Sequence, residues 1–212
     1  MAVHYGPQNP PVYTFNGADY YLAIDEGTSG YGGTVGGDAT EANGDYLSLT
    51  TNVNSQSGYI EYSGIFPGSR MYTTFDTYAG GGTGADAIWF WWGATSRPSS
   101  EDDTNHGGYL FAMDEYAGNK NFLDWDGTRL HTENVSDVDD GNWHSWTIEW
   151  NGSSSWAIKV WKDGSYVFGR NDSERTLTNP STIGWGGRTG GSNNHHRVRN
   201  MKFYVSTDDG TI

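Results

Sequence analysis

Apolar side chains recur at every second position of this chain, and glycine interrupts the recurrences. Trp146, Ile148 and Trp150 alternate with polar neighbours, which is the period of a β-strand with one buried face. The chain contains 31 glycines, and Asn151-Gly152 and Asp163-Gly164 follow successive alternating runs, as hairpin turns require. No window sustains the apolar spacing of a helix. The pattern therefore predicts an all-β chain of antiparallel strands, about a dozen in number.

The remaining runs extend this pattern over most of the sequence. Their short spacing is typical of a sandwich or jelly roll rather than of strands that alternate with helices. A length of 212 residues suits one large β-sandwich domain, predicted at 13–212 after a linker at 1–12. The linker lacks the basic and apolar segments of a signal peptide. The other alternating runs are 46–50, 57–62, 70–78, 156–160, 166–168 and 198–205.

The composition excludes several classes of partner. The formal net charge is −14, and an acidic surface repels nucleic-acid phosphates and anionic lipid. No apolar run approaches the length of a membrane span. We therefore expect no nucleic-acid partner and no membrane insertion. The acidic surface is compatible with neutral sugars, with a bound cation, or with solubility alone.

Four short motifs occur in an order that carries more information than any of them alone. They are Gly84-Ala85-Asp86-Ala87, Gly107-Gly108-Tyr109-Leu110, Asp114-Glu115-Tyr116 and Arg188-Thr189-Gly190. In this order they resemble the concanavalin A-like fold of the L-type lectins, over roughly residues 57–205. The resemblance implies a jelly-roll sandwich of two antiparallel sheets. It also implies carbohydrate binding.

The resemblance nominates residues for a sugar site. In that family the Asp of the first motif accepts hydrogen bonds from sugar hydroxyls, and a Gly of the second donates a backbone N–H, which implies these roles for Asp86 and Gly108. A carboxylate can accept several hydroxyl protons, and glycine lets a sugar ring approach the backbone. Tyr116 is a candidate to stack on the ring. The implied sugar-binding residues are Asp86, Gly107, Gly108, Tyr116, Asn193 and Asn194.

The same resemblance implies a calcium ion, held by an Asp, an aromatic residue's carbonyl, an Asn and a second Asp. Asp114 and Tyr116 match the start of this pattern, whereas the family's Asn falls nearest to Gly118, with Asn119 one place late. The Glu of the legume transition-metal site is Ala112 here, so a manganese-type site is not expected. Hard oxygen ligands suit Ca²⁺, and a site without any cation stays open. The candidate ligands are Asp114, Asn119 and Asp124.

Further expectations concern the neighbours of Asp86 and the histidines. The peptide bond before this Asp is cis in metal-loaded members of the family, so the resemblance implies a cis Ala85–Asp86 bond with a cation and a trans bond without one. Strand alternation places half of Trp89–Trp92 in the core and leaves the other half exposed as an alternative stacking surface. Adjacent His195 and His196 point to opposite sides, which favours solvated loop histidines over a transition-metal site.

Catalysis is the main alternative, because this fold also carries glycoside hydrolases. Hydrolysis needs two carboxylates at a defined separation. Asp114 and Glu115 are neighbours that point to opposite faces, and Glu61 and Glu149 are isolated strand residues, with Glu149 placed opposite the core. We therefore favour a non-catalytic lectin-like domain of an extracellular surface, adhesin or virion protein that binds glycans or polysaccharide. A glycoside hydrolase or lyase, and a structural shell domain without a sugar site, are the alternatives.

Overall fold

A computed structural model shows an all-β architecture, as the alternation predicts. Its described part contains sixteen strands and no helix. None of the described segments is a helix long and apolar enough to cross a membrane. The expected linker at 1–12 lies outside the described residues. These are 13–15, 18–27, 30–42, 44–65, 69–116, 118–135, 137–152, 158–172, 175, 177 and 181–206.

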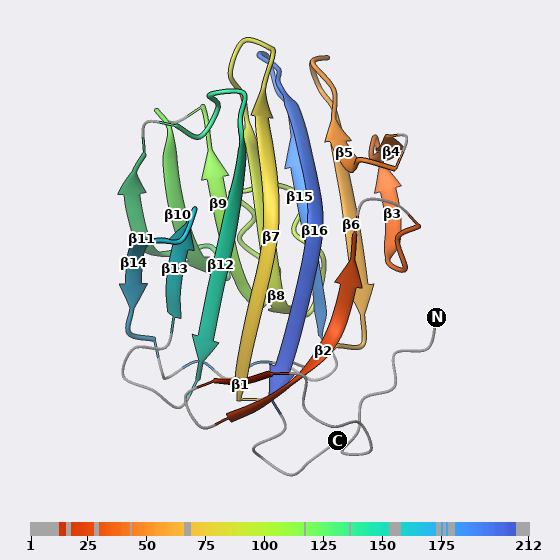
Figure 1. The fold of residues 1–212 in the computed structure, drawn as a ribbon. Helices are drawn as coiled ribbons and strands as arrows, with labels where there is room; N and C mark the ends of the chain where they lie inside the picture. Colours follow the sequence, from red (N-terminus) through yellow and green to blue (C-terminus); the bar gives the residue numbers. More distant parts are fainter. Residues whose placement is uncertain are drawn as a thin grey trace.

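One sheet has nine strands. They are β1 (Tyr13–Phe15), β2 (Ala18–Glu26), β4 (Thr40–Ala42), β5 (Tyr46–Thr50), β7 (Arg70–Gly80), β12 (Trp143–Asn151), β13 (Ile158–Lys162), β14 (Ser165–Arg170) and β16 (His195–Ser206). The main path is β1-β2-β16-β7-β12-β13-β14, with β5 paired to β16 and β4 to β5. Figure 1 shows β12, β7, β16 and β2 side by side in this sheet. Alternate side chains of β7 and β16 are buried, which confirms the predicted period.

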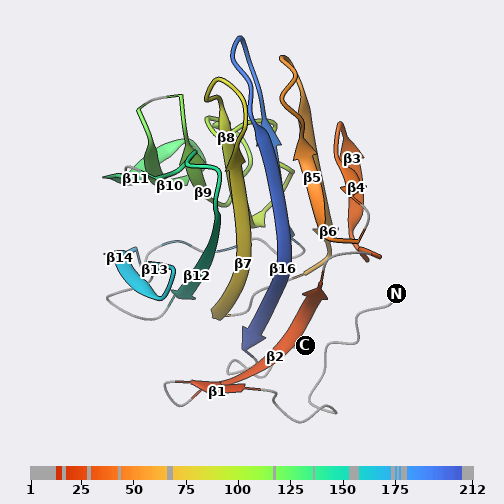
Figure 2. The ribbon, with the colours of Figure 1, turned by 45° about the horizontal axis from the view of Figure 1, so that its top comes forward.

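The other sheet has seven strands. They are β3 (Thr34–Gly37), β6 (Ser57–Ser63), β8 (Ala87–Ala94), β9 (Tyr109–Asp114), β10 (Lys120–Trp125), β11 (Thr128–Asn134) and β15 (Thr182–Arg188). Their order is β11-β10-β9-β8-β15-β6-β3. The turned view in Figure 2 shows this sheet as the second layer behind β7, β12 and β16. All pairings in both sheets are antiparallel, as predicted for a sandwich.

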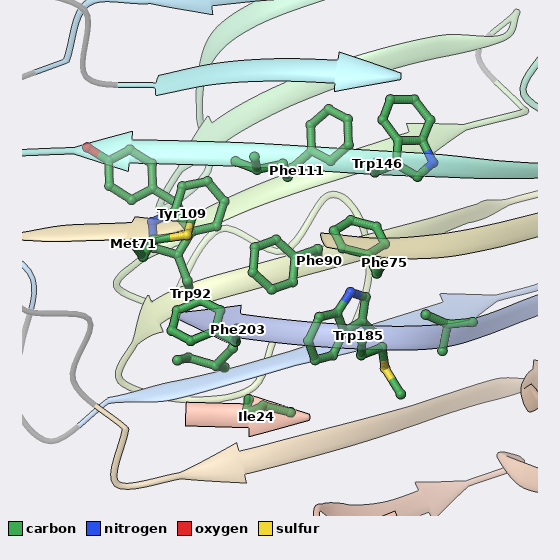
Figure 3. Close-up of a cluster of buried hydrophobic side chains, with 14 of the residues drawn as sticks. Ile24, Met71, Phe75, Phe90, Trp92, Tyr109, Phe111, Trp146, Trp185 and Phe203 are labelled. Atoms are coloured by element: carbon green, nitrogen blue, oxygen red, sulfur yellow. The ribbon is translucent and has the colours of Figure 1, made fainter. Parts of the chain in front are cut away.

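Aromatic side chains from both sheets fill the space between them. Phe90 and Trp92 of β8 stack with ring centroids 5.4 Å apart, and Trp92 stacks on Tyr109 of β9 at 4.8 Å. From the opposite sheet, Phe75 of β7 and Phe203 of β16 meet Phe90 at 5.4 and 6.3 Å. Figure 3 shows these rings interleaved in one cluster. This core holds the two sheets together and sets the positions of the loops at their ends.

The outer face of the seven-stranded sheet is covered as well. Trp89 and Trp91 point to this face, where they belong to a second buried cluster with Phe122 and are at most 1% exposed. The expectation that half of this strand would be exposed is therefore wrong. The physical reason is that the loop between β8 and β9 folds back over the sheet and buries its second face.

We call residues 95–106 of that loop the strap. Its two ends meet where Thr95 N donates to His106 O at 2.8 Å. Its middle is tied to the sheet by charged side chains, because Glu101 accepts a hydrogen bond from Arg188 at 2.7 Å and Asp102 lies 3.5 Å from Arg129. The strap therefore runs from one end of the sheet toward the other.

Candidate functional site

Three segments meet at the start of β8, around Asp86. The Asp86 N–H donates to Arg188 O at 2.9 Å, which joins the start of β8 to the end of β15. The Asp86 carbonyl accepts from the N–H groups of Glu115 and Tyr116 at 2.9 and 3.3 Å, which joins it to the end of β9. The Ala85–Asp86 peptide bond is cis, one of the two outcomes expected. The first, third and fourth sequence motifs are thus brought together.

The Asp86 carboxylate is nine-tenths buried, and Gly190 approaches it so closely that a larger residue would collide with it. A Cβ atom on Gly190 would lie 2.8 Å from Asp86 Oδ2 and 3.1 Å from Oδ1. Tyr116 is 76% exposed, and its backbone N–H donates to the Asp86 carbonyl. A carboxylate and an exposed aromatic residue on bonded backbone segments are groups suited to a sugar, since the hydroxyls can donate to the oxygens while the ring face covers carbon.

A turn that the sequence did not single out is bonded to the loop that contains Gly190. Residues 51–56 are tied to the 189–194 loop, because Asn54 Nδ2 donates to Gly191 O at 2.8 Å and Ser55 N donates to Gly190 O at 3.1 Å. Asn193 Nδ2 donates to Asn54 Oδ1 at 2.6 Å. Val53 of the same turn is 54% exposed. In the sequence, this turn is marked only by an apolar residue, Val53, among polar turn residues. That pattern is too common in loops to identify a binding site.

A buried polar network holds these loops from behind. Glu115 and His196 are both fully buried, with Glu115 Oε1 and His196 Nε2 2.7 Å apart. Glu115 Oε2 accepts from Asn194 Nδ2 at 2.5 Å, and Asn194 Oδ1 accepts from Gly82 N at 2.7 Å. Thr50 Oγ1 donates to Asn194 O and lies 2.8 Å from His196 Nδ1. Asn194 is therefore a structural residue here, with both amide atoms engaged inside the protein.

The histidine expectation is confirmed in one respect and wrong in another. His195 and His196 do alternate, with His195 partly exposed and His196 completely buried. His196 is not a solvated loop histidine, because a buried carboxylate is available as its partner. His106, in the strap, is also completely buried.

Two of the three candidate calcium ligands lie at this end of the sheet. Asp114 ends β9, and Asn119 precedes Lys120, whose backbone pairs with Asp114. Asn119 Nδ2 donates to Asp139 Oδ1 at 3.1 Å, so a second carboxylate that the sequence analysis overlooked joins them. Asp124 does not join them, because it pairs with Arg129 and its backbone faces Leu110, four positions along the ladder.

Gly107 and Gly108 lie at the opposite end of the sheet from Asp86. Gly108 packs on Ala94, since a Cβ on it would lie 2.6 Å from Ala94 Cα. Ala94 is the last residue of β8, and the strand rises about 3.3 Å per residue, which places the two ends roughly 25 Å apart. The Gly107 N–H donates to Asp126 Oδ1 at 2.8 Å. The structure therefore does not bring this glycine pair to Asp86; the strap reaches the site instead.

An acidic cluster close to the site is accounted for by its own contacts. Asp137, Asp140 and His144 offer ligand atoms within 4.8 Å of one another. His144 bonds Asp140 at 3.1 Å and Asp163 at 2.7 Å through its two ring nitrogens, and Lys162 lies 2.6 Å from Asp137. These partners tie the cluster to the turn after β13.

Comparison with known proteins places the fold. No protein-family model matches the sequence, and no curated protein matches it. Among solved structures, the exoplasmic/lumenal domain of VIP36 in its Ca²⁺/Man2-bound form matches with TM-score 0.71 and 16% identity, covering 89% of this chain and 91% of that one. Lectin II from Ulex europaeus matches with TM-score 0.69 and 15% identity, covering 88% and 97%.

A third structure agrees with these two. The lectin from Bauhinia forficata in complex with GalNAc matches with TM-score 0.68 and 17% identity, covering 90% of this chain and 100% of that chain. All three similarities extend over nearly the whole length of both chains. The protein therefore has the concanavalin A-like fold of the L-type lectins.

Proposed function

We propose that this chain is a non-catalytic carbohydrate-binding domain. The observation that carries the proposal is the position of Asp86: its backbone is bonded to Arg188, Glu115 and the exposed Tyr116, and its carboxylate is closely approached by Gly190. Solved structures of the same fold support it, since VIP36 is described in mannose-bound form and the Bauhinia lectin in complex with GalNAc.

In the proposed complex each residue has one task. Asp86 accepts hydrogen bonds from two sugar hydroxyls, because a carboxylate offers several acceptor sites. Tyr116 lies against one face of the ring and shields its carbon atoms from water. In the proposal the 51–56 turn and Asn193 border the site on the other side, where Val53 offers an apolar contact.

A calcium ion belongs to this proposal. We infer that Asp114, Asn119 and Asp139 would hold it, because they supply the hard oxygen donors that Ca²⁺ prefers and because Asn119 and Asp139 already touch. When bound, the ion would neutralise adjacent carboxylates and brace Asp114 and Asn119, which flank Tyr116 in the sequence. The ion would therefore influence sugar binding by fixing the position of Tyr116.

The charged groups at this site support binding rather than hydrolysis. The carboxylates of Glu115 and Glu101 are both buried and tied to His196 and Arg188. Glu115 has both oxygens bonded, to His196 and Asn194, and Glu101 is bonded to Arg188, so we infer that neither serves as the acid that a glycosidase requires. A role outside the cytosol, in a surface, adhesin or virion protein, is part of the same proposal, since soluble glycans and polysaccharides are met there.

The direct test is a glycan array on the wild type and on Asp86→Ala, with product analysis of every sugar that binds. We expect intact ligand and a loss of roughly tenfold to a hundredfold in affinity for Asp86→Ala, the value of a hydrogen bond to a charged group. Asp25→Ala, in the exposed part of β2, is the matched control. Released reducing ends would favour a hydrolase. An unchanged Asp86→Ala profile would refute the proposed site, and no binding to any glycan would favour a structural shell domain.

A further inference from the structure

The strap brings a buried glutamate to the proposed sugar site. Glu101 is only 4% exposed, and its Oε1 accepts a hydrogen bond from an Arg188 terminal nitrogen at 2.7 Å. Its other oxygen, Oε2, is buried and has no hydrogen-bond partner among the residues that the structure describes. A buried carboxylate with an unsatisfied oxygen is costly to a fold, so its position calls for a functional reason.

Arg188 lies between this glutamate and Asp86. Its Nε is 3.1 Å from Asp86 Oδ2, yet Nε makes no aligned hydrogen bond within the described part of the chain. The well-formed hydrogen bond of the guanidinium is thus the one to Glu101. The Asp86 carboxylate is therefore attracted by the positive charge of Arg188, but its oxygens accept no aligned hydrogen bond from Arg188 Nε.

We propose that Glu101 is a positioning residue of the sugar site: by holding Arg188, it keeps the oxygens of Asp86 available to sugar hydroxyls, and acidification that protonates Glu101 weakens binding. The inference rests on the proposed function. Glu101 acts through Arg188. When Arg188 is not bonded to Glu101, it bonds Asp86 in competition with the sugar.

The surroundings of Glu101 give the direction of the pH effect. Arg188 of β15, Asp86 at the start of β8 and Asp102 of the strap are the charged groups that face it. Burial raises the pKa of the Glu101 carboxyl above its usual value; its own backbone N–H and Arg188 lower the pKa, and Asp102 and Asp86 raise it. Protonated Glu101 has lost its charge and holds Arg188 more weakly, so the guanidinium turns its donors to Asp86 and occupies the acceptor sites that a sugar needs.

The raised pKa also has a consequence for stability. A carboxyl whose pKa is raised by folding stabilises the protein fully below its unfolded value, and this contribution is lost as the pH rises through the folded value. Glu101→Gln stays neutral at every pH. It is therefore expected to melt at a higher temperature than the wild type at pH 7, and at a similar temperature under acidic conditions.

The experiment combines affinity and melting temperature for three variants, using a glycan that the array identifies. At pH 7 we expect Glu101→Gln to bind about three- to tenfold more weakly than the wild type, the value of one lost hydrogen bond, while melting at a higher temperature. The double variant Glu101→Gln/Arg188→Gln removes the competing cation and should return to within about twofold of the wild-type affinity. Wild-type affinity should fall on acidification, and that of the double variant should fall less.

Two results overturn the inference. One is a Glu101→Gln protein that binds as tightly as the wild type at every pH, and the other is a double variant as weak as Glu101→Gln. If Asp86→Ala abolishes binding while Glu101→Gln does not change it, only the inference fails. If the wild type binds no glycan, the proposed function fails and the inference falls with it. An NMR titration checks the bridge without sugar: Arg188→Gln must raise the Glu101 midpoint, and an unmoved midpoint contradicts the inference.

Discussion

Replacing His196 with leucine tests the buried network behind the site. The change leaves the fully buried Glu115 carboxylate with the Asn194 amide and without the imidazole 2.7 Å from Oε1. Breaking a buried pair by removing one partner costs about 3–5 kcal/mol, and the remaining bond from Asn194 places the value near the lower end. For a chain of this size the melting temperature should fall by roughly 6–12 °C, at about 2–4 °C per kcal/mol.

Urea unfolding followed by tryptophan fluorescence measures the loss directly. His195→Leu is the matched control, because this neighbour points the other way and is partly exposed; it should cost less than about 1 kcal/mol. Adding Glu115→Gln to His196→Leu removes the stranded charge and should recover part of the loss. A cost below about 1 kcal/mol for His196→Leu would refute the reasoning, as would a double variant less stable than the single one.

Three further outcomes follow from the site. Gly190→Ala places a methyl group 2.8 Å from Asp86 Oδ2, so glycan affinity should fall at least tenfold with little change in melting temperature; undiminished binding would contradict a sugar contact at Asp86. Calorimetric titration after chelation should show Ca²⁺ binding that Asp139→Asn weakens and Asp124→Asn leaves unchanged, and the reverse order would restore Asp124 as a ligand. Burial alone would raise the pKa of Asp140, but the hydrogen bonds from its neighbours together have the larger effect and lower the pKa to about 2. Its stabilisation is present above the ordinary value of 3.8 and is lost as the pH falls to about 2. The wild type should therefore exceed Asp140→Asn in unfolding free energy at pH 6 but not at pH 2.

Sequence periodicity predicted the strands that have one polar face. The outer side chains of β12 are mostly polar, so its alternation is visible and Glu149 was correctly placed opposite the core, where it pairs with Lys159. Strand β8 is buried on both faces, so it shows no alternation. The fold of the strap over Trp89 and Trp91 depends on contacts between residues far apart in sequence, which local patterns do not encode.

The same limit explains which site residues were predicted. Asp86 and Tyr116 belong to motifs whose order survives in the fold, and the structure joins them through backbone hydrogen bonds. Asp139 follows Asn119 by twenty positions, and nothing in its local sequence marks it as a partner. Gly107 resembles a motif locally but lies at the far end of β9. Spacing along the chain identifies a site only when the connecting loop runs the expected way.

The measurement that tests the central claim most directly is an amide chemical-shift titration of the labelled protein with a glycan from the array. The site at the Asp86 end predicts the largest changes at residues 53–55, at Asp86 and Tyr116, and at Gly190, with calcium increasing their size. Changes confined to Gly107 and Gly108, at the opposite end of the sheet, would contradict it.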